Sequence, residues 1–497
     1  MDGYVHVENI NNLIELMSDI EHYIGDYFWN NSNEYILHIG PTNSGKTYNA
    51  LKALKIASTG IYLSPLRLLA YEVYEGLNSE GILCNLRTGE EKISVPGAQI
   101  TSATVEICPT NPVEVVVIDE CSMIADDYRG EKWLHAMLRV KGEQVHLILN
   151  EESEALVTNL LKATNNKFRI ERYKRLVPLE VVETPFGIKK LPKNTILVVF
   201  SRIDALTMKA FFEKKSIKTS VLYGTLPPEV KKEQMEKFIR GETQVCVATD
   251  CIGMGLNLPS EYVVFFKMDK FDGNKIRQLN NFEINQIAGR AGRYNQYAKG
   301  FVGGISGQQV KLLKANINKT LIKFSHTWFG LNLDLLKLIP GISHWDKLVY
   351  WGQAELVPNE LNQIVKMQKN KKYVELYDPQ MEQYTLDEFF ALISLPVKDD
   401  NRQYYDKLVA GFHYRVLRPP MSIAKYNKSM SAPIGNNNSL KSHEAMLSEI
   451  YLYLNCINSR VLGIYTEKIE INPIKDKLID KISTYLVSTK LKKYVES

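Results

Sequence analysis

One loop constrains this chain more than any other stretch, because its sequence is that of a phosphate-binding loop. Gly40–Thr47 reads G-P-T-N-S-G-K-T and fits the pattern G-x-x-x-x-G-K-[ST]. The apolar run Tyr35–Ile39 precedes it as an expected strand, and the helix-forming run Tyr48–Lys55 follows it. In that context, backbone N–H groups and the positive end of the helix converge on phosphate oxygens. The pattern therefore predicts a nucleoside triphosphate site.

Individual residues of this loop have separate expected roles. Lys46 can reach the β- and γ-phosphates, and the Thr47 hydroxyl can ligate Mg²⁺. Magnesium is therefore expected as a cofactor together with the nucleotide. The expected nucleotide-binding residues of the loop are Gly40, Pro41, Thr42, Asn43, Ser44, Gly45, Lys46 and Thr47.

The bulk composition indicates a globular protein. The chain has 497 residues, of which 45% are hydrophobic and 24% are charged. Its apolar runs are far too short to cross a bilayer, so no membrane partner is expected. Acidic residues near the N-terminus, such as Asp2 and Glu8, argue against a signal or transit peptide. We expect a cytoplasmic protein, or a mitochondrial one only if a transit peptide has been removed. The net charge of +5 permits a nucleic-acid partner without arguing for one.

The order of apolar and helical segments predicts an α/β protein with four parts. Residues 1–33 show helical spacing of apolar side chains. Residues 34–175 and 176–325 each alternate short strands with helices, which implies two tandem parallel sheets. Residues 326–497 are expected to form a mainly helical accessory domain, with a loop over Ser431–Ser439. The expected strands are Tyr35–Ile39, Gly60–Leu63, Gln99–Ser102, Val113–Ile118 and Val145–Leu149, then Thr195–Phe200, Ser220–Tyr223, Gln244–Ala248, Tyr262–Phe266 and Gly300–Ile305.

An acidic pair follows one of these strands. The apolar run Val113–Ile118 ends in Asp119 and Glu120. Ligands of such sheets bind at the carboxyl ends of the strands, where both the phosphate loop and this pair fall. Asp119 would hold the hydration shell of Mg²⁺, and Glu120 would orient or deprotonate the attacking water. The pair thus predicts hydrolysis of the nucleotide.

An arginine motif lies in the second block. Gln286–Arg293 reads Q-I-A-G-R-A-G-R, and its arginines can point at a γ-phosphate across a cleft between two lobes. Arg293 is the expected finger that stabilises charge in the transition state, with Arg290 and Gln286 also at the phosphate. The expected catalytic residues are Lys46, Asp119, Glu120, Gln286, Arg290 and Arg293.

Further motifs in the same order resemble one helicase family. S-P-L-R-L-L-A, T-G-E-E, A-T-V-E and Y-G-T-L-P-P-E accompany the loop, the acidic pair and the arginine motif over residues 35–305. Together they resemble the RNA helicase of the mitochondrial degradosome and its bacterial relatives, in the DExH branch of superfamily 2. The resemblance implies two RecA-like lobes that close on ATP and Mg²⁺. It also implies 3′-to-5′ unwinding, with RNA as the main substrate and DNA tolerated. Degradation would need a partner exoribonuclease, because no nuclease site is evident.

The resemblance also assigns expected contacts. Residues 248–257 read A-T-D-C-I-G-M-G-L-N, similar to the motif that couples the nucleic-acid backbone to the ATP cleft. Within it, Asp250 and Gly253 are expected on the ATP side. Hydroxyls, amides and guanidiniums that bind phosphates without reading bases suit movement along any single strand. The expected nucleic-acid contacts are Pro65, Arg67, Thr88, Gly89, Thr104, Ser201, Arg202 and Thr249.

The chain departs from the family pattern at two places. Ser122 stands where the family usually has Gln, so the bridge to Gln286 is expected to be weaker or to run through water. His146–Glu151 stands where an S-A-T motif is usual. Asp272-Gly273 is a hairpin-turn signal, read either as a duplex wedge or as a plain surface loop. Beyond residue 326, basic and aromatic residues suit either strand stacking or an ordinary helical surface. These residues are Trp345, Trp351, Lys369, Lys371, Lys372 and Tyr373.

Two other functions stay open from the sequence. A DNA helicase or translocase would use the same motor on another strand. An ATP-gated RNA-binding scaffold subunit would clamp RNA for a partner nuclease without unwinding it. Ser122 and the missing S-A-T motif are the features that favour the scaffold. Separation of matched RNA and DNA duplexes distinguishes all three.

Overall fold

A computed structural model describes most of the chain after residue 32. The described residues are 33–109, 111–127, 129–224, 226–253, 256, 258–271, 275–317, 323–331, 333–337, 342–353, 364–367, 371–431, 433–467 and 469–487. The helical prediction for residues 1–33 lies outside them except at Asn33, and so do Asp272-Gly273 and Lys369.

The phosphate loop belongs to a first sheet of eight described strands. Their spatial order is β4 (Lys92–Ile93), β3 (Cys84–Arg87), β5 (Ile100–Thr104), β2 (Gly60–Ser64), β6 (Val113–Ile118), β7 (Gly142–Leu149), β1 (Glu34–Ile39) and β8 (Phe168–Arg172). All neighbours are parallel except the antiparallel pair β3 and β4. Central strands such as β6 are buried on both faces, which is why they read as continuous apolar runs. The helices of this first lobe are α3 (Lys46–Ile56), α4 (Arg67–Ser79), α5 (Gly130–Arg139) and α6 (Glu154–Ala163), with short 3₁₀ turns η1 (Val105–Ile107), η2 (Cys121–Ala125) and η3 (Glu151–Ser153).

A second, all-parallel sheet forms the second lobe. Its described strands lie in the order β11 (Thr219–Leu222), β12 (Val245–Ala248), β10 (Thr195–Val198), β13 (Tyr262–Phe265), β16 (Gly300–Gly304) and β9 (Leu179–Val181). Its helices are α7 (Arg202–Glu213), α8 (Pro228–Ile239), α9 (Asn281–Ala288) and α10 (Gly307–Asn316), with the 3₁₀ turn η4 (Asp250–Gly253). A separate antiparallel hairpin, β14 (Asp269–Phe271) and β15 (Ile276–Gln278), flanks the expected Asp272-Gly273 turn.

The remainder of the chain forms a mainly helical region. Its helices are α11 (Leu333–Lys337), α12 (His344–Gln353), α13 (Lys371–Leu376), α14 (Leu386–Ile393), α15 (Arg402–His413), α16 (Ile423–Ser429), α17 (Asn437–Asn458) and α18 (Asn472–Val487), with 3₁₀ turns η5 (Pro379–Gln383) and η6 (Leu462–Ile464). Two short parallel strands, β17 (Thr327–Phe329) and β18 (Val365–Met367), precede most of them. Thr327 Oγ1 donates a hydrogen bond to Ile124 O at 2.7 Å, which docks this region on the first lobe.

The predicted fold class is confirmed, and each of the ten predicted strands is present with ends within three residues. The edge strand β8 was not predicted, because its sequence F-R-I-E-R alternates charges and is half exposed. The prediction of a loop over Ser431–Ser439 is wrong for its last three residues, which belong to α17. The Asn436 side chain accepts a hydrogen bond from Ser439 N at 2.8 Å and so begins α17. Trp351 is fully buried and its ring stacks near Phe329, so it is a core residue.

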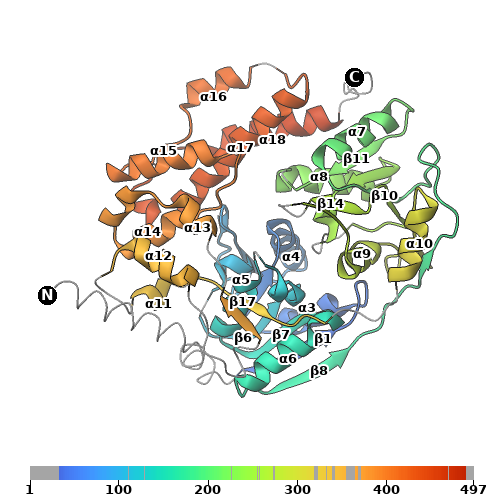
Figure 1. The fold of residues 1–497 in the computed structure, drawn as a ribbon, viewed down its shortest axis with the longest axis horizontal. Helices are drawn as coiled ribbons and strands as arrows, with labels where there is room; N and C mark the ends of the chain where they lie inside the picture. Colours follow the sequence, from blue (N-terminus) through green and yellow to red (C-terminus); the bar gives the residue numbers. More distant parts are fainter. Residues whose placement is uncertain are drawn as a thin grey trace.

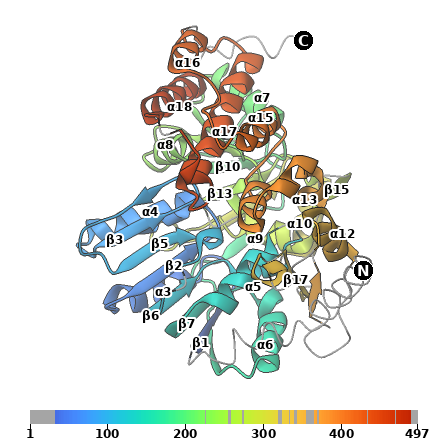
Figure 2. The same cartoon turned by 90° about the vertical axis from the view of Figure 1, so that its left-hand side faces the viewer.

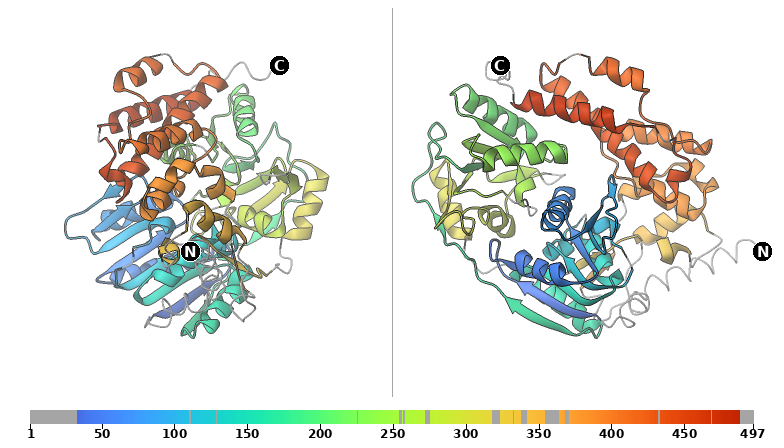
Figure 3. Two further views of the ribbon diagram at one scale, coloured as in Figure 1. Left: turned by 60° about the vertical axis from the view of Figure 1, so that its left-hand side comes forward. Right: turned by 180° about the vertical axis from the view of Figure 1, so that it is seen from behind.

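The three parts surround a common centre (Figure 1). The first lobe lies at the bottom of that view, the second lobe on the right and the helical region at the upper left. In the turned views, α17 and α18 arch from the helical region toward the second lobe (Figures 2 and 3), and α18 contacts α8. Among the described helices, none combines the length and apolar character that crossing a bilayer would take.

Candidate functional site

The geometry of the phosphate loop depends on one glycine and one buried lysine. Gly45 has φ +86°, a left-handed backbone that favours glycine, and leads directly into α3. Lys46 opens that helix and is only 8% exposed. Its Nζ donates hydrogen bonds to Pro41 O at 2.9 Å and to Asn150 Oδ1 at 3.2 Å, and it also contacts Gly40 O. Burial lowers the pKa of Lys46 to about 8, against the opposing effect of nearby carboxylates.

The acidic pair lies beside this lysine at the carboxyl end of β6. Asp119 accepts hydrogen bonds from Tyr62 OH at 2.8 Å and from Thr47 Oγ1 at 3.5 Å. Glu120 has φ +46°, a conformation that is strained for a residue with a side chain and recurs at functional sites. Burial raises the pKa of both carboxyl groups, and the positive charge of Arg290 opposes this shift.

Arg290 approaches the acidic pair from the second lobe. Its Nη2 donates to Gly253 O at 3.0 Å and its Nη1 to Leu256 O at 3.2 Å. Burial lowers its pKa, and the two carboxylates oppose this shift. Arg293 faces a different charge, Glu72 of α4. The assignment of the finger to Arg293 stays a prediction, and the structure places Arg290 beside the carboxylates.

The two lobes touch at the phosphate loop itself. Thr42 Oγ1 donates to Gln286 Oε1 at 3.4 Å, and Asn43 Nδ2 donates to Gly292 O at 2.5 Å. A Cβ at Gly289 would lie 2.7 Å from Thr42 Cβ, so only glycine allows this close approach. The structure therefore places the phosphate loop in contact with the arginine motif, as a nucleotide site divided between two lobes requires.

Arg175 joins this contact, although no sequence motif singles it out. It lies between the last strand of the first sheet and the first strand of the second. Its Nη1 donates to Thr42 O at 3.0 Å and to Gly289 O at 3.1 Å, and it also bonds Ala291 O. Its Nε donates to Val177 O at 2.8 Å. Burial lowers the pKa of Arg175 to about 10. One guanidinium thus holds carbonyl groups of both lobes.

The residues of the site fit a triphosphate with its magnesium ion. Thr47 and Asp119 offer hard oxygen donors, which Mg²⁺ prefers. Two nearby donors, Asn150 Nδ2 and Arg290 Nε, are buried without a hydrogen-bond partner among the described residues. Buried donors of this kind are costly to leave unpaired, and phosphate oxygens would satisfy them.

Ser122 makes a connection within the first lobe. Its Oγ accepts a hydrogen bond from Asn150 N at 2.8 Å and lies 3.0 Å from Ser153 Oγ. Asn150 in turn contacts Lys46, so the acidic box is tied to the segment that replaces the usual S-A-T motif. Gln286 meets the phosphate loop instead of residue 122.

The remaining expected ATP contacts, Asp250 and Gly253, and the expected nucleic-acid contact Thr249 follow strand β12. Gly253 contributes its carbonyl group to Arg290, as described above. Asp250 pairs with Lys270 of the hairpin at 3.5 Å, and its contact with a ribose stays a prediction. Thr249 is buried, and its backbone N–H donates to Leu222 O at 2.9 Å. Gly253 thus connects this segment to the nucleotide site through Arg290.

A cavity of about 810 Å³ lies between the two lobes and the helical region. The expected nucleic-acid contacts on its wall are Pro65, Arg67, Gly89 and Thr104. Basic residues that the motifs do not single out also line it, namely Arg129, Lys132, Arg139, Lys231 and Lys398. Four carboxylates share the wall: Glu90, Glu106, Asp400 and Glu444. Clustered cations in a cavity suit a phosphate backbone.

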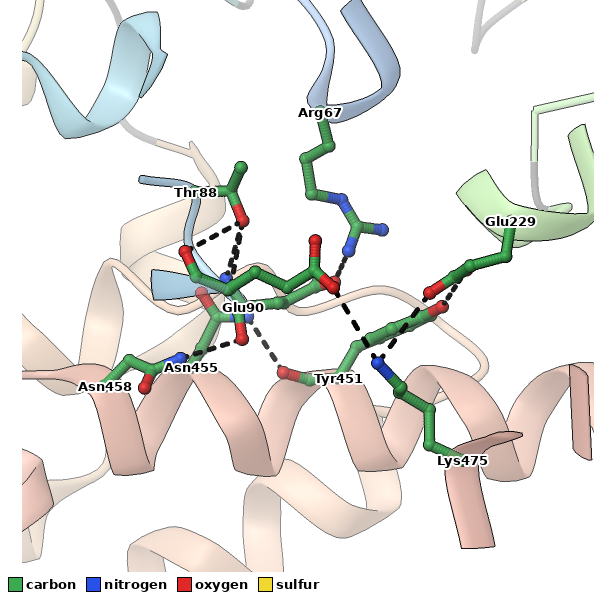
Figure 4. Close-up of polar contacts among 9 residues, drawn as sticks. Arg67, Thr88, Glu90, Glu229, Tyr451, Asn455, Asn458 and Lys475 are labelled. Carbon is green, nitrogen blue, oxygen red and sulfur yellow. Dashed lines mark hydrogen bonds and ion pairs between the residues drawn. The ribbon is translucent and has the colours of Figure 1, made fainter. Parts of the chain in front are cut away.

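The other expected nucleic-acid contacts have intramolecular partners and are not among the residues that line this cavity. Thr88 Oγ1 accepts a hydrogen bond from Glu91 N at 3.0 Å and so stabilises its own turn (Figure 4). Ser201 caps α7 by accepting from Asp204 N at 3.0 Å. Arg202 is paired with a carboxylate of α17. Their roles as contacts stay predictions.

Comparison with known proteins identifies the core of this chain. Residues 29–173 match the family described as the DEXQ-box helicase domain of Suv3, and residues 173–295 match the helicase conserved C-terminal domain. The first lobe is a Suv3-type helicase domain. The two matches meet at residue 173, between β8 and β9, where the structure passes from the first sheet to the second. The family resemblance drawn from the motifs is thereby confirmed, with Ser122 in place of the Gln of a DEXQ box.

Two named helicases are similar in sequence to this chain. The mitochondrial ATP-dependent RNA helicase SUV3 of Saccharomyces paradoxus is 35% identical over 448 residues, covering 84% of this chain and 60% of that protein. The mitochondrial ATP-dependent RNA helicase SUPV3L1 of Homo sapiens is 38% identical over 293 residues, covering 56% of this chain and 37% of that protein. The chain thus spans 60% or less of the length of these relatives. A solved Escherichia coli DEAH/RHA helicase, HrpB, is 15% identical with a TM-score of 0.48, covering 89% of this chain and 60% of that one.

Proposed function

We propose that this protein is an ATP-dependent RNA helicase that moves along one strand by closing and opening two RecA-like lobes. The observation that carries the proposal is the divided nucleotide site, in which Lys46 and Asp119 come from one lobe and Arg290 from the other. A site divided in this way is complete only when the lobes approach, which couples hydrolysis to movement. We assign the lobes to residues 34–175 and 176–325, and an accessory domain to residues 326–497.

Each group at the site has a definite task in this proposal. Lys46 neutralises the β- and γ-phosphate oxygens. Thr47 would ligate Mg²⁺ and Asp119 would hold its hydration shell, and the bound ion would withdraw negative charge from those oxygens. Glu120 orients the attacking water and takes up its proton, a role that suits a carboxylate whose pKa burial has raised. Arg290 stabilises the charge that develops on the phosphate, and Arg293 joins it when the lobes close.

The strand would lie in the cavity between the lobes and the helical region. Arg67 and Thr104 on the first lobe and Arg202 on the second would bind its phosphates in turn, which gives alternating grip. Contacts to the backbone alone carry no sequence preference. The names of the relatives support RNA as the strand, and the family resemblance supports movement from 3′ to 5′.

Stimulated hydrolysis and strand separation test the proposal together. ATP hydrolysis should rise when single-stranded RNA is added, and RNA duplexes with a 3′ tail should be separated faster than those with a 5′ tail. The Lys46→Ala variant should neither hydrolyse ATP nor separate RNA duplexes. Separation of matched DNA duplexes alone would support the DNA motor instead. ATP-dependent RNA affinity without separation would support the scaffold. Turnover that RNA leaves unchanged at every salt concentration would overturn the translocase proposal.

Partner and compartment complete the proposal. Because no nuclease site is evident in the sequence, we propose a separate exoribonuclease as the partner that degrades the unwound strand. The named relatives are mitochondrial, so mitochondria are the compartment to test first, ahead of the cytoplasmic expectation. A fluorescent fusion to the C-terminus that stays in the cytosol would restore that expectation.

A further inference from the structure

Arg202, which the sequence predicts to bind a phosphate, already holds an anion from within the protein. Its Nη2 lies 2.8 Å from Glu444 Oε2. Tyr223 OH donates to Glu444 Oε1 at 2.5 Å and fixes the carboxylate in place, and the guanidinium lies over the Tyr223 ring, 5.5 Å from its centre. Arg202 opens α7 of the second lobe, whereas Glu444 belongs to α17 of the helical region. The pair therefore spans two parts of the molecule.

Glu444 stands between Arg202 and the cavity. The carboxylate lines the cavity wall and Arg202 does not. Side-chain exposure is 19% for Arg202 and 6% for Glu444. Arg202 Nη2 is engaged by this carboxylate, whereas Arg202 Nε is buried without a hydrogen-bond partner among the described residues. A guanidinium behind one carboxylate is a site that a backbone phosphate could occupy instead, because its two non-bridging oxygens carry one negative charge and accept hydrogen bonds as a carboxylate does.

Arg67 on the first lobe is held in a similar way (Figure 4). It forms an ion pair with Glu90, and its guanidinium stacks on the Tyr451 ring of α17, 4.6 Å from the ring centre. Tyr451 OH donates to Glu229 Oε2 of the second lobe at 3.1 Å. Asn458 Nδ2 donates to Glu90 O at 2.9 Å. Helix α17 thus contacts both arginines that the strand is expected to use.

One face of α17 presents these groups to the cavity. The residues of α17 on the cavity wall recur at helical spacing: Glu444, Leu447, Ser448, Tyr451 and Asn455. Only Glu444 among them is charged. A carboxylate on a wall that faces phosphates would repel a strand unless it is engaged by a cation. Its engagement by Arg202 is therefore the arrangement that needs a functional explanation.

We propose that Glu444 is an internal stand-in for a nucleic-acid phosphate, which covers Arg202 until a strand enters the cavity and replaces it. The inference rests on the proposed function, because it takes the cavity to be the strand site. A phosphate of the strand gains free energy by binding Arg202, but the Arg202–Glu444 ion pair must first be broken. The cost of breaking this pair lowers the affinity for the strand. A ligand with a single phosphate binds too weakly to displace Glu444, whereas a strand that engages several cations together displaces it.

Removal of one charge tests this exchange in the full chain. Glu444→Gln keeps the side-chain shape and an acceptor for Tyr223. Glu449→Gln is the matched control, because Glu449 is on the same helix but not on the cavity wall. Binding of a labelled single-stranded RNA would be followed by fluorescence anisotropy without ATP at several salt concentrations. We expect Glu444→Gln to bind about tenfold more tightly than the wild type, because the variant has no charge pair to break before the strand binds. Glu449→Gln should stay near the wild type.

Further variants keep the result decisive if Glu444→Gln folds poorly. Tyr223→Phe leaves the charge but removes the hydrogen bond that fixes the carboxylate, and it should also tighten RNA binding. In a Glu444→Gln background, Arg202→Gln should weaken RNA binding again, because the strand then loses the guanidinium that its phosphate binds. The slope of log affinity against log salt should be the same for wild type and Glu444→Gln, because the same number of phosphates is bound.

The outcomes separate this inference from the proposed function. If the wild type binds neither RNA nor DNA strands, the proposed function fails. If the wild type binds but Glu444→Gln matches Glu449→Gln, or binds more weakly while melting at the wild-type temperature, Glu444 only pins α17 to the second lobe and the inference is overturned. The same holds if Tyr223→Phe leaves the affinity unchanged.

Discussion

Replacement of Arg175 by alanine should impair hydrolysis, although Arg175 lies outside every recognised motif. The guanidinium donates to carbonyl groups of the phosphate loop and of the arginine motif, at Thr42, Gly289 and Ala291. In the variant these carbonyl groups lose a charged donor, and the two lobes lose a direct link beside the nucleotide. We expect the closed arrangement to be populated less often.

The size of the effect follows from the three hydrogen bonds. Two of them, to Gly289 and Ala291, join the two lobes. A hydrogen bond from a charged donor contributes about 1.5 kcal/mol net, so the closed arrangement loses about 3 kcal/mol. Since each 1.4 kcal/mol corresponds to about a tenfold change, kcat/KM for ATP should fall by roughly one hundredfold. Because closure is needed for the chemical step, most of the loss should appear in kcat. Arg175→Lys should restore little, because an ammonium group cannot bridge several carbonyl groups as a guanidinium does.

Steady-state phosphate release with saturating RNA is the assay, and Arg172→Ala is the control. Arg172 lies three positions earlier, is exposed, and pairs with Glu154 at the surface at 2.6 Å. The Arg172→Ala variant should hydrolyse ATP like the wild type. Thermal unfolding of both variants checks that the fold is intact. Equal kcat/KM for the two variants, with unchanged unfolding temperatures, would refute the reasoning.

Three other predictions concern the same site. Arg290→Ala and Arg293→Ala should each lower turnover at least about one hundredfold, and nearly normal phosphate release by Arg293→Ala would exclude it as the finger. Ser122→Ala removes the acceptor for Asn150 N. It should lower the free energy of unfolding by about 1 kcal/mol in denaturant unfolding, and it should lower the rate of phosphate release. Unchanged stability would contradict the role assigned to that hydrogen bond. Burial raises the pKa of Glu72 to about 7, so the folded protein binds the proton of the Glu72 carboxyl group more tightly than the unfolded chain does. The free energy of unfolding should therefore fall as pH rises from 4.5 through about 7. Glu72→Gln should remove that fall in thermal unfolding curves between about pH 5 and pH 8, whereas Glu75→Gln, which loses an exposed pair with Lys232, should not.

Much of the fold could be predicted from sequence because its signals are local. The phosphate loop, the acidic pair and the arginine motif each depend on residues within ten positions, and the strands that carry them are continuous apolar runs. Such a run must be buried on both faces, which only a covered parallel sheet provides. Even the approach of Gln286 to Thr42 was implied, because a nucleotide site divided between lobes needs both motifs at one phosphate.

Tertiary structure alone decided which groups these motifs meet. Arg175 has no pattern around it, and its role follows from carbonyl groups that two different sheets bring within reach. Ser122 looked like a missing bridge between lobes, yet the path of β7 places Asn150 beside it. Glu444 stands 221 positions from the tyrosine that holds it. A residue can be recognised as a cation, an acid or a strand former from its neighbours in sequence. Which partner satisfies it in the folded protein depends on how distant segments pack, and local pattern carries no information about that.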